Sequence, residues 1–282
     1  MNDITNSDFP DHTSWHIKRR SFIAGTAGLA ASIGIGAGSF LNSPRAEALT
    51  LTFVDDFTGA AGSKPNPRVW AARQGSTGYF PSAVYLDSAA TAFVDGNSNL
   101  VLRAMKCTAP PPWWPSAQYQ AAWLTTKASF SSGINSVWEA RIKFDPTKGV
   151  WPCFWLMGVN KDWPECGEVD IIELFSTLGA GSTVHAPIPG KRDTIKAQKN
   201  VAFDDQWHTW RLQWDDSGFK FWQDYTYGKA PYFTVATDSL DNWPFSDSNP
   251  LYIILNTNVV GDLDAAKLPC DMLVDWVRVG RI

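Results

Sequence analysis

Three acidic residues lie close together in an otherwise hydrophobic stretch of the sequence. Residues 167–173 read GEVDIIE, so valine and isoleucine separate Glu168, Asp170 and Glu173. Valine and isoleucine favour buried β-strands, where carboxylates lose hydration and repel one another. Because such a cluster is costly, it indicates a functional site. Paired carboxylates of this kind can serve as nucleophile and general acid in glycoside hydrolysis.

The spacing of the acids predicts how they face. Glu168 and Asp170 are two residues apart and therefore share one face of a strand. A regular strand would turn Glu173 to the other face, and a β-bulge at Ile171 and Ile172 would return it. The two glutamate Cα atoms would then lie about 13 Å apart. Their long side chains could bring the carboxyl groups to the ~5–5.5 Å of retaining glycosidases, with Asp170 supporting the nucleophile between them.

Two alternatives to a catalytic site remain for these acids. The first is an ordinary solvated strand face, which the intervening valine and isoleucines and the flanking tryptophans disfavour. The second is a divalent metal site, because three carboxylates are suitable ligands for Ca²⁺ or Mg²⁺. A near-regular strand, however, lacks the backbone carbonyls and curvature that wrap such an ion.

The elements that must position these acids are predicted to be short β-strands. Alternating segments separated by glycine, proline, asparagine and aspartate are typical of an all-β sandwich or barrel. One segment, residues 150–157, is nearly all apolar, and its alternation places Trp151 and Trp155 on one face. The expected strands are residues 100–105, 136–144, 150–157, 168–174, 208–214, 219–224, 251–259 and 272–279.

Composition narrows the class of protein further. The chain has 282 residues and a net charge of −4, so we expect no nucleic-acid partner, because such proteins need a basic surface. Hydrophobic residues make up 44% of the chain, which suffices for a core and argues against disorder. The 15 tryptophans indicate a very aromatic core or flat stacking surfaces for a ring-shaped ligand.

The N-terminal region resembles a twin-arginine export signal. RRSF at residues 19–22 begins a glycine-diluted apolar stretch over 22–41, and AEA at 46–48 matches a small-x-small cleavage site. We therefore expect a signal peptide at 1–48 and a catalytic domain at 49–282, with no stable membrane insertion after cleavage. The protein would be secreted, periplasmic or held at the cell surface. An uncleaved anchor is the alternative, for which the apolar length is marginal.

Export also bears on the cysteines. Disulfides are allowed in an oxidising compartment, and four cysteines permit three pairings. Buried free thiols are the alternative, and the sequence does not choose between the two states. The residues concerned are Cys107, Cys153, Cys166 and Cys270.

Two motifs resemble the catalytic block of glycoside hydrolase family 16. They read WPCFWLMG at residues 151–158 and WPECGEVDIIE at 163–173. The longer, bulged form of the second motif is similar to the laminarinase and agarase branches of the family. Weaker resemblance continues through residues 53–57, 207–210, 252–256 and 274–279. The resemblance implies a β-jelly-roll sandwich of two antiparallel sheets with a concave substrate cleft.

The resemblance also implies roles for the acids. Glu168 would be the nucleophile, Glu173 the general acid/base and Asp170 the supporting acid. The chain would be a retaining endo-glycosidase that cuts a β-linked polysaccharide, with β-1,3-glucan the leading substrate. No cofactor would be needed for catalysis, and we expect a monomer. The alternatives are an agarase-type galactan hydrolase, a transglycosylase and a non-catalytic carbohydrate-binding jelly roll. The complete set of acids disfavours the last of these.

Further residues are expected to line the cleft or to bind a structural ion. Trp163 would stack on a sugar near the cleavage point, and Trp123 stands where many laminarinases have arginine. The substrate-binding candidates are Trp163, Trp155, Trp151, Trp123, His185 and Asn256. Many family members hold one Ca²⁺ on the convex face. Here its ligands would be the Asp275 side chain and the backbone carbonyls of Asp56 and Gly96.

Overall fold

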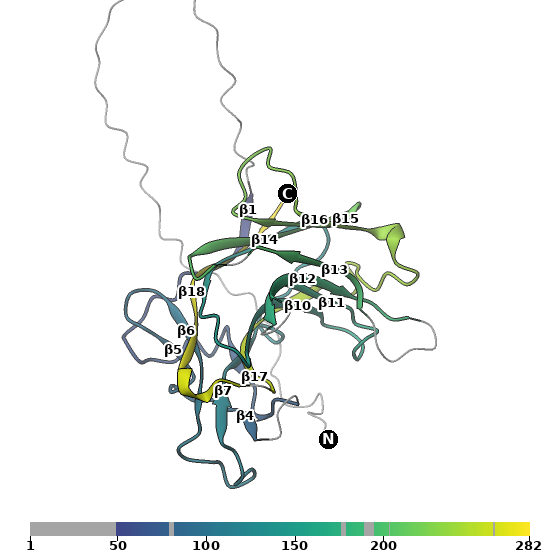
Figure 1. Ribbon diagram of the computed structural model, residues 1–282. Helices are drawn as coiled ribbons and strands as arrows, with labels where there is room; N and C mark the ends of the chain where they lie inside the picture. Colours follow the sequence, from purple (N-terminus) through teal and green to yellow (C-terminus); the bar gives the residue numbers. More distant parts are fainter. Residues whose placement is uncertain (1–48, 79–81, 176–178, 189–194, 203, 262) are drawn as a thin grey trace, which may run out of the picture. The chain divides into compact units, whose positions relative to one another are not determined.

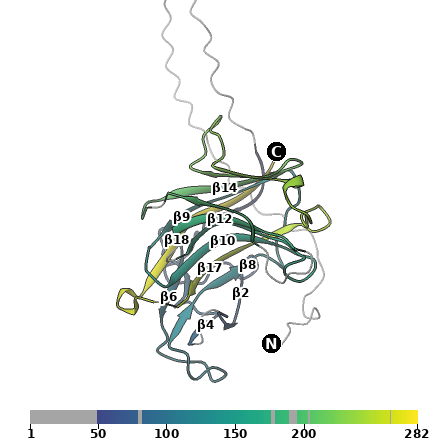
Figure 2. The same cartoon turned by 45° about the vertical axis from the view of Figure 1, so that its right-hand side comes forward.

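Two β-sheets stacked as separate layers make up most of the described chain (Figures 1 and 2). This computed structural model describes residues 49–78, 82–175, 179–188, 195–202, 204–261 and 263–282. The predicted export signal at 1–48 lies outside the described residues. Within them, no helix has the length and apolar character needed to cross a bilayer.

The larger sheet has 11 strands, which are antiparallel apart from the β4–β7 pair. Its central path runs β16 (Phe233–Ala236), β15 (Gly218–Gln223), β14 (His208–Asp215), β9 (Ser136–Phe144), β18 (Cys270–Arg281), β6 (Leu100–Lys106), β7 (Tyr119–Ala121), β4 (Ala83–Tyr85) and β3 (Gly75–Ser76). In addition, β1 (Thr50–Asp55) pairs with β18, and β5 (Ala92–Val94) pairs with β6.

The smaller sheet has seven strands and carries the acidic motif. Its order is β13 (Ile195–Val201), β12 (Gly179–His185), β11 (Glu168–Phe175), β10 (Val150–Gly158), β17 (Leu251–Val259), β8 (Trp123–Thr125) and β2 (Ala71–Ala72). Two short 3₁₀ turns, η1 (Thr237–Ser239) and η2 (Ala265–Lys267), complete the described elements. Each of the eight strands expected from the sequence is present within two residues of its predicted bounds, and the prediction of a jelly-roll sandwich is confirmed.

Side-chain alternation divides each strand of the smaller sheet between core and outside. In β10, Phe154 and Leu156 are fully buried in the core between the sheets. Trp151 and Trp155, one residue out of phase, lie partly exposed on the opposite face, as predicted. We call this opposite side the outer face of the smaller sheet. The larger sheet contributes the buried indoles of Trp138, Trp210 and Trp214 to the core. Part of the high tryptophan content is therefore explained by core packing.

A β-bulge in β11 confirms the predicted irregularity between the acids. Against β10, Ile172 pairs with Phe154 while Asp170 pairs with the next residue, Trp155, so Ile171 is the extra residue. Pairing with β12 is interrupted over the same interval. Ile171 and Ile172 are both buried in the core, with exposures of 1% and 0%. The bulge therefore lets two successive isoleucines point inward before Glu173 returns to the outer face.

The loop between β10 and β11 is tightly held where it enters the acidic strand. The Asn249 side chain donates to the Cys166 carbonyl at 2.8 Å and accepts from the Asn160 amide at 2.9 Å. Gly167 has φ +74°, and a Cβ there would lie 2.5 Å from the Phe245 ring, so the position requires glycine. These contacts fix the backbone immediately before Glu168.

The four cysteines are free thiols in the structure, which agrees with the alternative of buried thiols. Cys153, Cys166 and Cys270 are buried, and Cys107 is half-buried. Cys153 lies in β10 directly opposite Glu173 of β11. Burial, with a further contribution from the negative charge of Glu173, holds the pKa of Cys153 well above its usual range, so this thiol is uncharged.

The bulge makes a sharp prediction about deletions. Deleting Ile171 leaves a regular strand in which Glu168, Asp170 and Glu173 still share one face, so the protein should fold at a cost of about 1–3 kcal/mol for the lost isoleucine. Deleting Val169 instead forces an acid toward the core and should cost about 4 kcal/mol or more. Urea unfolding of both variants measures the difference. Equal destabilisation would contradict this account of the bulge.

Candidate active site

The three acids lie together on the outer face of the smaller sheet. Val169, between Glu168 and Asp170, points into the core with no exposed surface. Asp170 and Glu173 are 4% and 9% exposed, and the Glu168 side chain is 18% exposed. The structure therefore places three nearly buried carboxyl groups on one strand face, which excludes an ordinary solvated face.

Two side chains from neighbouring strands hold the Glu173 carboxyl group. Thr183 Oγ1 of β12 donates to Oε1 at 2.8 Å, and Trp151 Nε1 of β10 donates to Oε2 at 3.0 Å. With one donor on each oxygen, the carboxyl plane is fixed relative to the sheet. Trp151 was predicted to bind substrate, and the structure shows that it orients an acid. Thr183 was missed, because its role depends on cross-strand register rather than on a motif.

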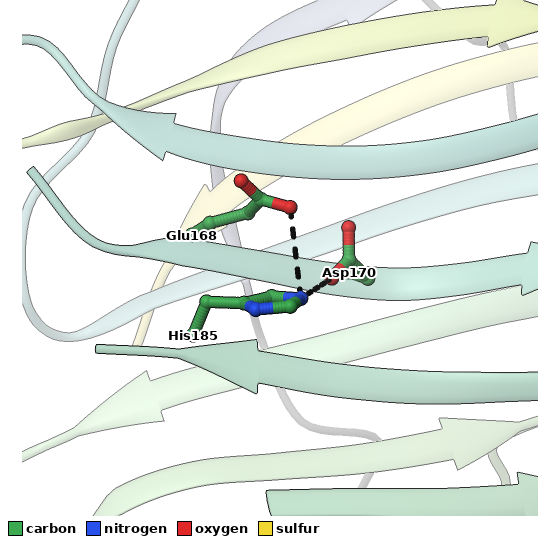
Figure 3. Close-up of side chains that lie close together, drawn as sticks. All are labelled: Glu168, Asp170 and His185. Carbon is green, nitrogen blue, oxygen red and sulfur yellow. Dashed lines mark ion pairs between the residues drawn. The ribbon is translucent and has the colours of Figure 1, made fainter. Parts of the chain in front are cut away.

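His185 connects the other two acids. It ends β12 directly opposite Glu168 of β11. Its Nε2 atom lies 3.3 Å from Asp170 Oδ2 and 3.7 Å from Glu168 Oε1 (Figure 3). His185 was predicted to line the cleft, and the structure places it beside two of the acids. Trp163, from the β10–β11 loop, lies close by, with its ring centroid 6.4 Å from that of His185 and 40% of its surface exposed.

Burial raises the pKa values of all three acids, and repulsion between carboxylates adds to the shift for Glu168 and Asp170. Burial, together with the charge of Asp170, raises the pKa of Glu168 to about 8, although His185 and the Trp163 hydrogen bond oppose the shift. Burial and the charge of Glu173 hold the pKa of Asp170 well above its usual range, and burial also raises the pKa of Glu173. The cluster therefore keeps protons near neutral pH, which a carboxyl group that acts as a general acid requires.

An aromatic row extends from the acids across the same face. Trp155 Nε1 donates to Asn256 Oδ1 at 2.7 Å. The Trp155 ring contacts Trp123 edge to face at 5.2 Å. Trp123 in turn contacts the buried Tyr85 of β4, in the larger sheet, edge to face at 5.2 Å. The Arg73 guanidinium lies 4.6 Å from the Trp123 ring centroid. Trp155, Trp123 and Asn256 were predicted here, whereas Tyr85 and Arg73 carry no sequence motif.

The expected Ca²⁺ ligands lie apart from the acids, along β18 of the larger sheet. Asp275 is an extra residue in the β18–β9 ladder, and Asp56 and Gly96 follow β1 and β5, in segments next to β18 and its partner β6. The Asp275 carboxylate already accepts from Arg141 at 2.6 Å, so a cation would share it with that arginine. The Ca²⁺ ion stays a prediction.

Jelly-roll sandwiches with acids and aromatic rings on one sheet face are a class that includes carbohydrate-active proteins. The chain belongs to glycosyl hydrolases family 16, whose family model matches residues 83–278.

Solved structures and a curated relative agree with that assignment. A β-1,3-glucanase from Mycobacterium marinum is 40% identical, with a TM-score of 0.69 over 83% of this chain and 100% of that one. An immunostimulatory antigen and pseudo β-1,3-glucanase of Mycobacterium tuberculosis is 36% identical, with a TM-score of 0.70 over 82% and 99%. Glucan endo-1,3-β-glucosidase A1 of Niallia circulans is 27% identical over 69% of this chain, which spans only 31% of that relative.

The raised pKa of Glu168 predicts a pH-dependent gain in stability for Glu168→Gln. The folded pKa of about 8 lies above the ordinary value of 4.5, so the carboxyl destabilises the fold increasingly as pH rises between them. A neutral glutamine avoids this cost, and the variant should be more stable by about 1–3 kcal/mol near pH 8. The gain should disappear near pH 4, which thermal unfolding across the pH range measures.

Glu165→Gln is the matched control, because Glu165 is an exposed acid in the adjoining loop. Its effect should be small at every pH. A Glu168→Gln variant that is equally stable relative to wild type at pH 4 and pH 8 would contradict the burial argument.

Proposed function

We propose that the protein is an exported, retaining endo-β-1,3-glucanase. The observation that carries the proposal is the pair of differently held glutamates on one strand face. Glu173 is fixed by Thr183 and Trp151, while Glu168 lies beside Asp170 and His185. Two glutamates in separate polar surroundings can take the two different roles that a retaining mechanism requires.

The proposed reaction is a double displacement. Glu168 attacks the anomeric carbon of the sugar while Glu173 donates its proton to the departing glycosidic oxygen. A water molecule then enters, Glu173 takes a proton from it, and the covalent bond between Glu168 and the sugar is broken. His185 beside Glu168 favours the charge that this residue needs for attack, whereas a charged Asp170 opposes it. No step calls for a cofactor.

The choice of substrate rests on the relatives and on the aromatic rings. The Mycobacterium marinum and Niallia circulans proteins are named for action on β-1,3-glucan. The exposed Trp163 ring gives a flat surface on which a sugar ring can stack, and Trp155 and Trp123 are partly exposed. We expect a monomer that is carried out of the cytoplasm by the N-terminal signal, with a structural Ca²⁺ at Asp56, Gly96 and Asp275.

A binding role without catalysis is the second candidate. It is favoured by one observation, the similarity to the Mycobacterium tuberculosis protein described as a pseudo β-1,3-glucanase. The buried acids argue for catalysis, because a binding surface gains nothing from three carboxyl groups that destabilise the fold.

Reducing-sugar release from laminarin decides between the two candidates. The wild-type protein should release oligosaccharides whose new ends first form in the β configuration, as seen by NMR. Glu168→Gln should lower the rate by about 10³-fold or more while the protein still binds the polysaccharide. Binding without release by folded wild-type protein would overturn the glucanase proposal. Release from agarose, carrageenan or xyloglucan alone would redirect the choice of substrate.

The contact between Thr183 and Glu173 makes a separate kinetic prediction. Thr183→Val removes a donor that favours the ionised carboxyl, so the pKa of Glu173 should rise further. The alkaline limb of the kcat/KM profile should move to higher pH, and activity should fall about tenfold through lost orientation. Thr183→Ser keeps the hydroxyl group and should behave as wild type. Identical pH profiles for the valine and serine variants would contradict this role.

A further inference from the structure

We propose that Glu168, Asp170 and His185 form a binding site for Zn²⁺ and similar borderline divalent cations. The inhibition that would follow rests on the proposed glucanase activity, whereas cation binding can be tested without turnover. The site combines one imidazole nitrogen with two carboxylate oxygens, and these three atoms lie within 4.8 Å of one another.

The two separations that involve His185 are close to those of tetrahedral zinc. With ligands about 2.0–2.1 Å from the metal, two ligands of a tetrahedron lie about 3.3–3.4 Å apart. Nε2 of His185 is 3.3 Å from Asp170 Oδ2 and 3.7 Å from Glu168 Oε1. Figure 3 shows this nitrogen pointing between the two carboxyl groups. Small side-chain rotations would bring all three atoms into the first coordination shell.

The buried Oδ2 atom of Asp170 gives a second observation that favours a cation. The residue is 4% exposed, and its Oδ2 atom accepts no hydrogen bond within the described part of the chain. This oxygen is directed at His185 Nε2. A cation between the two atoms would place a positive charge next to a carboxylate that has lost its hydration on burial.

The ligand set also selects the kind of metal. Imidazole with carboxylates suits Zn²⁺, Cu²⁺, Ni²⁺ or Co²⁺, while Ca²⁺ takes six to eight oxygens. The third carboxyl does not add to the set, because Glu173 is turned to Thr183 and Trp151. The proposed site therefore differs from the three-carboxylate Ca²⁺ or Mg²⁺ site considered from the sequence, because its ligands are one nitrogen and two oxygens.

A bound cation would act as a reversible inhibitor. Three protein ligands leave the fourth tetrahedral position for water on the outer face of the sheet. With its carboxylate held by the metal, Glu168 could not attack a sugar. The proposed hydrolysis would therefore be inhibited in a zinc-rich environment and would proceed where zinc is scarce or chelated.

Zinc titration of the full-length chain by calorimetry tests the proposal. Wild-type protein should bind one Zn²⁺, and Co²⁺ in its place should give the intense visible absorption of a tetrahedral complex. His185→Asn should weaken binding by about tenfold or more and abolish that absorption. The control is His208→Asn. His208 begins β14 of the larger sheet, and it contacts Asp224 through Nδ1 and Asp204 through Nε2, so the two carboxylates do not share one ring nitrogen.

The outcomes separate this proposal from the glucanase proposal. Binding that is unchanged in folded His185→Asn, or lost in His208→Asn, would overturn the site, as would the absence of binding at millimolar Zn²⁺. An excess of Mg²⁺ or Ca²⁺ should not compete. If the protein cuts laminarin, Zn²⁺ should inhibit in competition with substrate, and EDTA should restore the rate. If the protein binds zinc but cuts no polysaccharide, the zinc site is supported and only the glucanase proposal is wrong.

Discussion

One extra residue in β11, Ile171, lets the strand bury two successive isoleucines and still place all three acids on its other face. A regular strand with this sequence could not do both. Both isoleucines of the motif enter the core, and Glu173 still returns to the face of Glu168 and Asp170. The bulge thus adds apolar burial to the strand that also carries three destabilising carboxyl groups. The pairings of β11 with β10 and β12 resume on both sides of the bulge, so the acids sit on a rigid support.

The cost of burying the acids is offset by contacts from both neighbouring strands. β10 contributes the indole donor of Trp151, and β12 contributes the hydroxyl of Thr183 and the imidazole of His185. These partners come from different parts of the sequence and meet only through sheet register. Each acid therefore has its own surroundings, which is how identical side chains acquire different proton affinities.

The sequence sufficed to predict much of this arrangement. Strand positions followed from alternation, and the bulge followed from the odd spacing of Glu173 after Asp170. That Trp151 and Trp155 share one face of their strand followed in the same way. What alternation cannot give is which residue of one strand lies opposite which residue of another. For that reason Thr183 was missed, and the role of Trp151 was only partly anticipated.

Other features depended on contacts between distant segments. Arg73 lies over Trp123 because β2 pairs with β8, and neither strand has a distinctive sequence. Cysteine pairing could not be predicted, because a disulfide needs two cysteines close together in the fold, and the sequence does not give that distance. The position of His185 was expected from family resemblance, but its proximity to two carboxyl groups at once is a property of the folded sheet.

The most direct test of the account is to trap the covalent intermediate and locate it. A β-1,3-linked glucosyl donor with fluorine at C2 and an activated leaving group should form a slowly hydrolysed bond to the nucleophile. Peptide mass spectrometry of the inactivated protein should place the sugar on Glu168. A sugar attached to Asp170 or Glu173 would contradict the assignment of roles. Turnover of the fluorosugar to an α-configured product would contradict the retaining mechanism itself.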